Sequence, residues 1–195
     1  MGRIIVSEFV SLDGVMEDPG GSEGFERGGW AFEFDRGAEG DKFKMDELME
    51  ADAMLLGRVT YEGFAAAWPG RSDDAGFADK MNSMKKYVVS NTLESADWEN
   101  STVISGDAVD EIRRLKQSEA GDMLVAGSAT LVHALVDEGL VDEYRLMVFP
   151  VVLGAGKRMF AETPAAAPLE VVDSRTAGET QLLVLRPKDA ETESA

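Results

Sequence analysis

Short apolar segments alternate with helix-forming segments along most of this chain, and this alternation limits the fold more than any other feature. The strand-like segments are residues 3–10, 53–57, 86–90, 101–105, 122–126 and 143–153. The helix-like segments are residues 41–51, 60–68, 75–84, 107–118 and 128–139. Strands and helices in this order predict an α/β domain whose central sheet is largely parallel.

The C-terminal part has a different pattern. Residues 169–176 and 180–186 are both strand-like and are separated only by the three residues Ala-Gly-Glu. Such a short connection predicts an antiparallel hairpin, so the sheet is expected to be mixed. A chain of 195 residues suits one domain with one core, which we place at residues 1–186. The polar segment 187–195 is predicted to be a disordered tail.

Composition excludes several classes of protein. The chain has 37 acidic and 19 basic side chains, and its formal net charge of −18 would repel nucleic acids and anionic membranes. We find neither a signal peptide in residues 1–12 nor an apolar run long enough for a membrane span, so we expect a cytoplasmic protein. With no cysteine and one histidine, thiolate and multi-histidine metal sites are excluded, and we predict no metal.

Residues 18–40 contain seven glycines and the aromatic residues Trp30, Phe32 and Phe34. This composition predicts a long irregular loop, and loops of this length in a compact domain are usually functional or mobile. We assign Phe32 and Phe34 to the core. We assign Trp30 to contact with a flat heteroaromatic substrate, with a core position as the alternative.

Small polar residues follow three of the predicted strands. At the end of segment 53–57 they are Gly57, Arg58 and Thr60. At the end of segment 86–90 they are Ser90 and Asn91, and after segment 122–126 they are Gly127, Ser128, Ala129 and Thr130. One such junction alone is more often a simple helix cap. Because parallel strands bring their carboxyl ends together, three of them predict a crevice for an extended phosphorylated ligand. Neither G-x-G-x-x-G nor G-x-x-x-x-G-K-[ST] occurs in the chain.

Several longer segments resemble a known superfamily. They are SLDGVM (11–16), LLGRVTYE (55–62), KYVVSNTL (86–93), MLVAGSATLVHAL (123–135) and LVDEYRLMVFPVVLGAGKRMF (140–160). In this order they resemble the dihydrofolate-reductase-like superfamily, and most closely the reductase domain of the bifunctional riboflavin-biosynthesis deaminase/reductase. The resemblance implies a three-layer α/β/α fold on a mixed, mainly parallel sheet, NADPH as the cofactor, and a homodimer.

The resemblance also implies roles for the residues at the three junctions. Gly57, Arg58 and Thr60 would hold phosphates of the cofactor, with Arg58 at its adenosine end. Ser90 and Asn91 would lie near the adenosine 2′-phosphate, and the segment from Gly127 to Thr130 would cradle the pyrophosphate. Dihydrofolate reductases join two glycines at this third junction by a cis peptide bond. Here the second residue is Ser128, and a cis bond at this position would cost about 3–4 kcal/mol.

The substrate side leaves more alternatives open. The resemblance gives Asp13 a contact with substrate or nicotinamide, and the alternative is a turn residue that makes a local hydrogen bond. Asp41 stands sixteen residues before Gly57, close to the spacing of the acid that holds the pterin in dihydrofolate reductases. The alternative is that Asp41 is one of many surface acids.

The resemblance implies an NADPH-dependent reductase that transfers hydride to a small heterocyclic substrate. One candidate reaction is the reduction of 5-amino-6-(5-phosphoribosylamino)uracil. The alternatives are a dihydrofolate or pterin reductase, and a homologue that binds the nucleotide without turnover. No catalytic residue is identified from the sequence.

Overall fold

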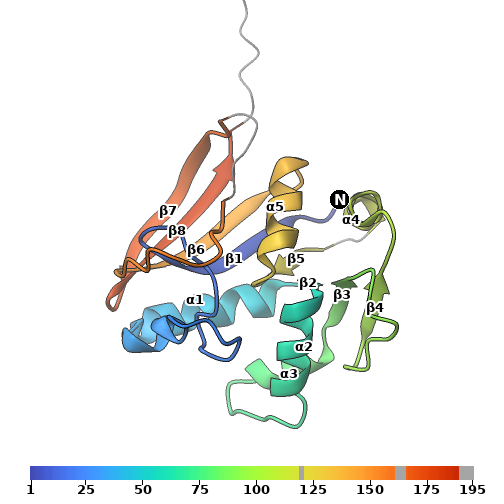
Figure 1. Ribbon diagram of the computed structural model, residues 1–195, viewed down its shortest axis with the longest axis horizontal. Helices are drawn as coiled ribbons and strands as arrows, with labels where there is room; N and C mark the ends of the chain where they lie inside the picture. The colour runs from blue at the N-terminus through green and yellow to red at the C-terminus, as the bar shows by residue number, and fades with distance from the viewer. Residues whose placement is uncertain (119–120, 161–165, 189–195) are drawn as a thin grey trace, which may run out of the picture.

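The computed structural model describes residues 1–118, 121–160 and 166–188. The strands are β1 (Ile4–Ser11), β2 (Ala53–Gly57), β3 (Lys85–Val89), β4 (Ser101–Ile104), β5 (Met123–Val125), β6 (Glu143–Phe149), β7 (Leu169–Ala177) and β8 (Thr180–Pro187). They form one sheet in the order β4-β3-β2-β5-β1-β6-β8-β7 (Figure 1). The first six strands pair in parallel, and β8 is antiparallel to both β6 and β7. The predicted mixed sheet with a C-terminal hairpin is confirmed.

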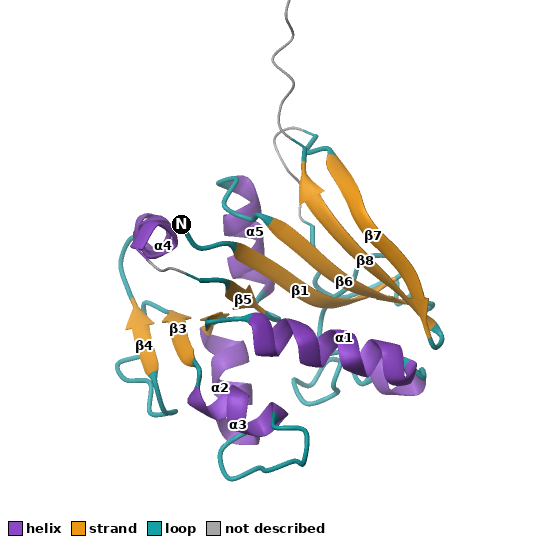
Figure 2. Ribbon diagram, turned by 180° about the vertical axis from the view of Figure 1, so that it is seen from behind, coloured by secondary structure: helices purple, strands orange, loops and turns teal. Residues whose placement is uncertain are grey.

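Helices cover both faces of the sheet (Figures 1 and 2). The helices are α1 (Gly37–Glu50), α2 (Arg58–Ala67) and α3 (Phe77–Ser83) on one face, and α4 (Ala108–Ser118) and α5 (Ala129–Asp137) on the other. On the first face Leu48, Tyr61 and Met81 belong to one apolar cluster, and on the second Ile112 and Leu135 belong to another. The predicted three-layer α/β/α fold is therefore confirmed. Among the described residues, no helix is long and apolar enough to cross a membrane.

Two predicted boundaries differ from the structure by four residues. Helix α1 begins at Gly37 instead of residue 41, because the Gly37 N–H donates to Asp35 Oδ1 at 2.7 Å and starts the helix earlier. Strand β6 ends at Phe149 instead of residue 153, because Pro150 has no N–H to donate to the sheet.

The chain continues in order just beyond the predicted end of the domain. Pro187 closes β8, and the Lys188 N–H donates to the Pro168 carbonyl oxygen at 3.0 Å. The rest of the predicted tail, residues 189–195, lies outside the described residues.

The sheet opens between β1 and β2 on its carboxyl side. Strand β5 lies between them but ends at Val125, and its pairing with β1 covers only Ile4 to Val6. Strand β1 continues to Ser11 and stays paired with β6 to its end. Among the described residues, the second half of β1 therefore has no strand partner on the β5 side, at the carboxyl ends of the parallel strands, where open α/β sheets bind ligands.

Candidate functional site

A cleft of about 580 Å³ lies at this opening. Its walls come from the second half of β1, the starts of α2 and α5, and the loop that follows β1, with residues such as Glu8, Gly57 and Gly127 in the lining. Cavities that hold small ligands and cofactors have volumes of a few hundred to about 1,000 Å³. The cleft is therefore large enough for a ligand of that class.

The β2–α2 and β5–α5 junctions form one wall of the cleft and are in direct contact. The Gly57 N–H donates to Ser128 Oγ at 2.8 Å. A Cβ atom on Gly57 would lie 3.3 Å from Ser128 Cβ, and one on Gly127 would lie 2.8 Å from Thr60 Oγ1. Helices α2 and α5 begin on this wall, so the first N–H groups of two helices, which have no partner within their own helix, lie there. Such groups favour an anion.

The chain turns from β5 into α5 through two residues in the left-handed region. Gly127 has a φ of +62° and Ser128 a φ of +64°. Among the described residues there is no cis peptide bond, so the structure does not have the cis bond considered at this junction. The left-handed backbone at position 127 suits a glycine, because side chains with a Cβ are strained there.

Arg58 lines the cleft and is paired within its own helix. Its Nη1 atom lies 2.9 Å from Glu62 Oε2, one turn along α2, and 43% of its side chain is exposed. Exposed pairs of this kind contribute only a few tenths of a kcal/mol up to about 1 kcal/mol. The guanidinium group can therefore exchange Glu62 for an anionic ligand at little cost.

Ser90 and Asn91 are not part of the cleft lining. Ser90 Oγ accepts the N–H groups of Thr92 and Leu93 at 3.1 and 3.0 Å, and Asn91 Oδ1 accepts the Gly106 N–H at 2.7 Å. Both side chains hold the loops at the ends of β3 and β4. The structure brings together two of the three predicted junctions and places the side chains of the third in local turns.

The aromatic assignments in the loop are corrected. Trp30 is only 2% exposed, its ring centroid lies 5.3 Å from that of Phe149, and its Nε1–H donates to the Glu17 carbonyl oxygen. Phe32 is 78% exposed and lines the cleft. The short helix η1 (Trp30–Glu33) directs these two side chains differently, so Trp30 belongs to the core and Phe32 is the ring available to a ligand. Phe34 packs against Phe149, as predicted.

The two acids expected near the substrate lie elsewhere. Asp41 Oδ1 is 2.6 Å from Arg36 Nε on the surface, and Asp41 is not among the lining residues. Asp13 Oδ1 accepts the Ser11 hydroxyl and the Leu153 N–H, and Asp13 Oδ2 accepts the Gly154 N–H. Asp13 therefore fastens the turn after β1 to the segment after β6. The hydrogen bond from Ser11, followed by those from Leu153 and Gly154, lowers the pKa of Asp13 to about 2.

Asp13→Ala is expected to lower the free energy of unfolding by about 1 kcal/mol at pH 7, since it removes hydrogen bonds to a partly exposed carboxylate. The pKa of Asp13 is about 2 in the folded protein, below the value of about 3.9 in an unfolded chain. Its stabilisation is therefore complete above about pH 4 and disappears as the pH falls towards 2. Urea titrations across this range, with Asp41→Ala as the control, would measure the difference; a loss that does not depend on pH contradicts this assignment.

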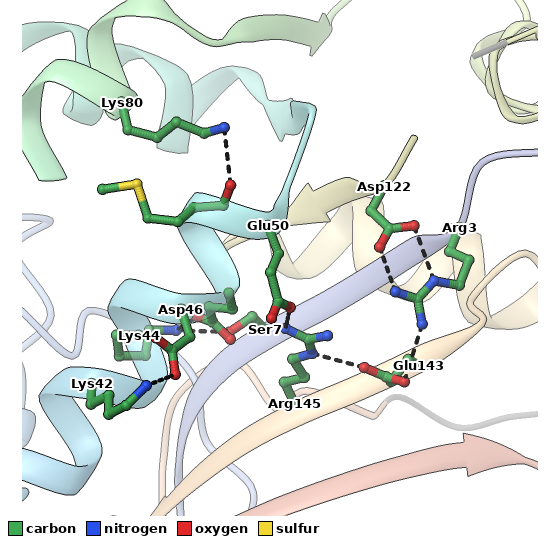
Figure 3. A network of polar contacts seen from close by, with 12 residues as sticks. Arg3, Ser7, Lys42, Lys44, Asp46, Glu50, Lys80, Asp122, Glu143 and Arg145 are labelled. Carbon is green, nitrogen blue, oxygen red and sulfur yellow. Dashed lines mark hydrogen bonds and ion pairs between the residues drawn. The ribbon is translucent and has the colours of Figure 1, made fainter. Parts of the chain in front are cut away.

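A polar cluster that contributes three residues to the cleft lining was missed from the sequence. It consists of Ser7 and Glu8 on β1 and Lys44 and Glu47 on α1. Ser7 Oγ donates to Glu47 Oε1 and accepts from Lys44 Nζ, both at 2.7 Å, and Lys44 also forms an ion pair with Glu47 (Figure 3 shows Ser7 and Lys44). Ser7, Glu8 and Lys44 line the cleft. A Ser-Glu pair inside an otherwise apolar strand was the signal that could have revealed the cluster.

Burial governs the protonation of Glu8. The residue is 5% exposed, and this burial raises the pKa of its carboxyl group well above the usual range. A hydrogen bond from the Gly127 N–H and the charge of Lys44 lower the pKa but do not compensate, and the charge of Glu47 raises it further. The cleft thus has the starts of two helices at one wall and, on β1, a carboxyl group whose pKa is raised.

Comparison with known proteins identifies a family whose model matches the chain and two proteins of similar sequence. Residues 3–183 match the RibD C-terminal domain. Two proteins of Bacillus subtilis (strain 168), both described as uncharacterized, are similar over most of their length: YyaP is 30% identical over 177 residues (89% of this chain and 88% of YyaP), and YwjB is 32% identical over 170 residues (87% and 89%).

Solved structures share the fold at low sequence identity. A putative riboflavin biosynthesis protein from Shewanella sp. PV-4 superposes with a TM-score of 0.76 at 20% identity, over 96% of this chain and 99% of the other. Acinetobacter baumannii RibD gives 0.64 at 20% identity, over 97% of this chain and 59% of RibD. Dihydrofolate reductase from Enterococcus faecalis, complexed with NADP(H) and RAB-propyl, gives 0.59 at 16% identity, over 96% and 98%.

Proposed function

The chain belongs to the RibD C-terminal domain family, and from this premise we propose that it is an NADPH-dependent reductase that transfers hydride to a small heterocyclic substrate. The family and the dihydrofolate-reductase fold support a reductase-type function. The observation that carries the finer proposal is the wall in which Gly57 and Ser128 join two helix starts. That wall suits the phosphates of a dinucleotide.

The walls of the cleft would divide the work of binding. Gly57, Thr60 and the segment from Gly127 to Thr130 would hold the diphosphate, because the first N–H groups of a helix have no partner within the helix and the glycine at position 127 lets the backbone come close to Thr60 without a clashing Cβ atom. Arg58 would hold the 2′-phosphate. The bound cofactor would supply the hydride, while the protein binds, orients and shields the reactants.

The exposed ring of Phe32 supports a flat heterocycle as the substrate. Family membership favours 5-amino-6-(5-phosphoribosylamino)uracil or a similar ribosylamino-pyrimidine. The pterin alternative depended on Asp41, which pairs with Arg36 outside the cleft lining. A pyrimidine is therefore preferred to a pterin.

Titration with NADPH and NADH, followed by thermal shift and calorimetry, tests the proposal. We expect NADPH to raise the melting temperature and NADH to raise it less. We then expect oxidation of NADPH at 340 nm with a member of a panel of ribosylamino-pyrimidines and dihydropterins. A protein that NADPH does not stabilise would overturn the proposed function. Tight binding of NADPH without turnover of any panel member would support a binding protein instead.

Arg58→Ala is expected to weaken the binding free energy of NADPH by about 1.5–3 kcal/mol and that of NADH by less, because a charge-assisted contact to the 2′-phosphate is lost. Arg114→Ala is the matched control, since Arg114 also forms an exposed pair with a glutamate of its own helix, Glu111, and lies on α4 away from the cleft. Calorimetry with both cofactors separates the outcomes. Equal losses for NADPH and NADH would place Arg58 at the diphosphate.

A further inference from the structure

Glu8 occupies the point at which the sheet opens. Val6 is the last residue of β1 that pairs with β5, so Glu8 lies two positions further along, where the β5 side of the strand faces the cleft. The Gly127 N–H at the β5–α5 junction is near enough to its carboxyl group to lower its pKa. The Glu8 side chain therefore lies between its own strand, β1, and the β5–α5 junction, which belongs to the wall suited to phosphates.

One oxygen of Glu8 has no partner in the described part of the chain. Glu8 Oε1 is fully buried and accepts or donates no hydrogen bond there. The nearby ammonium group of Lys44 is already engaged by Glu47 and Ser7. A buried polar atom without a partner costs about 1–3 kcal/mol, so its retention at a cleft wall points to a ligand that satisfies it.

The surroundings of Glu8 favour the protonated form of its carboxyl group, because they raise its pKa. Burial is the largest cause of its raised pKa, and the acids that face it, Glu47 on α1 and Glu23 on the loop after β1, raise the pKa further. Lys44 on α1 and the Gly127 N–H at the start of α5 act in the opposite direction and are outweighed. A neutral carboxyl group has one O–H to donate.

We propose that Glu8 is the proton donor of the reduction in this cleft, an inference that rests on the proposed function. The substrate bond would be a carbon–nitrogen double bond, which dihydropterins and the open-chain form of a ribosylamino-pyrimidine share. The carbon receives hydride from the reduced nicotinamide, which is oxidised, and the nitrogen receives the proton of Glu8. A C–H and an N–H bond form, the π bond breaks, and the resulting Glu8 carboxylate regains a proton from solvent.

Glu8→Gln separates proton donation from binding, because glutamine keeps the shape and an N–H donor but has no acidic proton. We expect NADPH affinity to stay within about threefold of wild type and kcat on the reactive panel member to fall at least about 100-fold. Glu33→Gln, at an exposed position outside the cleft lining, should retain wild-type kcat. A Glu8→Gln variant with kcat within about threefold of wild type would overturn the proposal, as would a loss confined to KM.

A measurement without substrate checks the protonated state of Glu8. Because its pKa is raised in the folded protein, wild type should lose stability relative to Glu8→Gln as the pH rises above about 4.3, the value for an unfolded chain. The difference in melting temperature should grow as the pH rises above that value, and a carboxylic acid C=O band that persists above it in wild type should be missing in the variant. A constant temperature difference and no such band would overturn the proposal even if NADPH binds. Absence of NADPH binding with the band present would instead overturn the proposed function, and with it the donor role.

Discussion

Gly127→Ala is expected to lower the affinity for NADPH at least about tenfold, a change of 1.4 kcal/mol or more. The added Cβ atom would lie 2.8 Å from Thr60 Oγ1 and 3.0 Å from Thr60 Cγ2. The backbone there has a φ of +62°, which costs a residue with a Cβ about 1–2 kcal/mol. The β5–α5 turn must therefore shift, and it carries the N–H groups proposed to hold the diphosphate. Calorimetry with NADPH measures the loss.

Gly63→Ala is the matched control for this substitution. Gly63 lies inside α2, and a Cβ atom added there would meet nothing within 4 Å. Alanine in a helix interior is about 0.5–1 kcal/mol more favourable than glycine, so this variant should be more stable and bind NADPH as wild type does. Equal affinity of the two variants would show that the turn at Gly127 does not hold the cofactor.

The sequence was most informative where one physical requirement determined the residues. Continuous apolar segments such as 53–57 identified buried parallel strands, and the three-residue connection before 180 identified the hairpin. The β2–α2 and β5–α5 junctions were also predictable, because glycines and hydroxyls after such strands are needed for close backbone approach. Gly57 and Gly127 both stand where an added Cβ would be crowded.

The sequence was misleading where the role of a residue depends on whether its side chain points into the core, into the cleft or into its own turn. Trp30 and Phe32 stand two residues apart in the same loop, and only the turn of η1 determines which of them is buried. Ser90 has the composition of an anion site but satisfies the N–H groups of its own turn. Glu8 was missed because the residues around an acid in a strand do not show whether its side chain points into a cleft or pairs with another side chain.

The acidic composition does not prevent the cleft from binding an anion. The three cations that line it, Lys44, Arg58 and Lys157, pair with Glu47, Glu62 and Glu17 respectively. A phosphate would therefore compete with these carboxylates for the side chains, whereas in the described part of the chain none of the three carboxylates accepts a hydrogen bond from a backbone N–H at the start of α2 or α5. This arrangement favours the main chain as the larger source of phosphate affinity, so we expect Gly127→Ala to weaken NADPH and NADH alike, whereas Arg58→Ala should discriminate between them.

Lys86→Met is expected to lower the free energy of unfolding by about 2–4 kcal/mol without changing the affinity of the folded protein for NADPH. Lys86 is fully buried, and its Nζ donates to the carbonyl oxygens of Asn82, Met84 and Glu99 at 2.8–3.0 Å. Burial lowers the pKa of Lys86 to about 8, and its Nζ lies 4.1 Å from the centre of the Trp98 ring. Methionine fills the space but leaves three carbonyl groups without this donor.

Lys42→Met is the control for Lys86→Met, because Lys42 forms an exposed pair with Asp46 and should contribute less than about 0.5 kcal/mol. Urea unfolding measures both variants, and calorimetry below their melting transitions measures NADPH. Lys86 joins the end of α3 to the segment before β4, at the amino end of β3, whereas the cleft lies at the carboxyl ends of the strands. If Lys86→Met lowered the affinity for NADPH as strongly as Gly127→Ala does, the two ends of the sheet would be coupled. The β2–α2 and β5–α5 junctions alone would then not determine the geometry of the cleft.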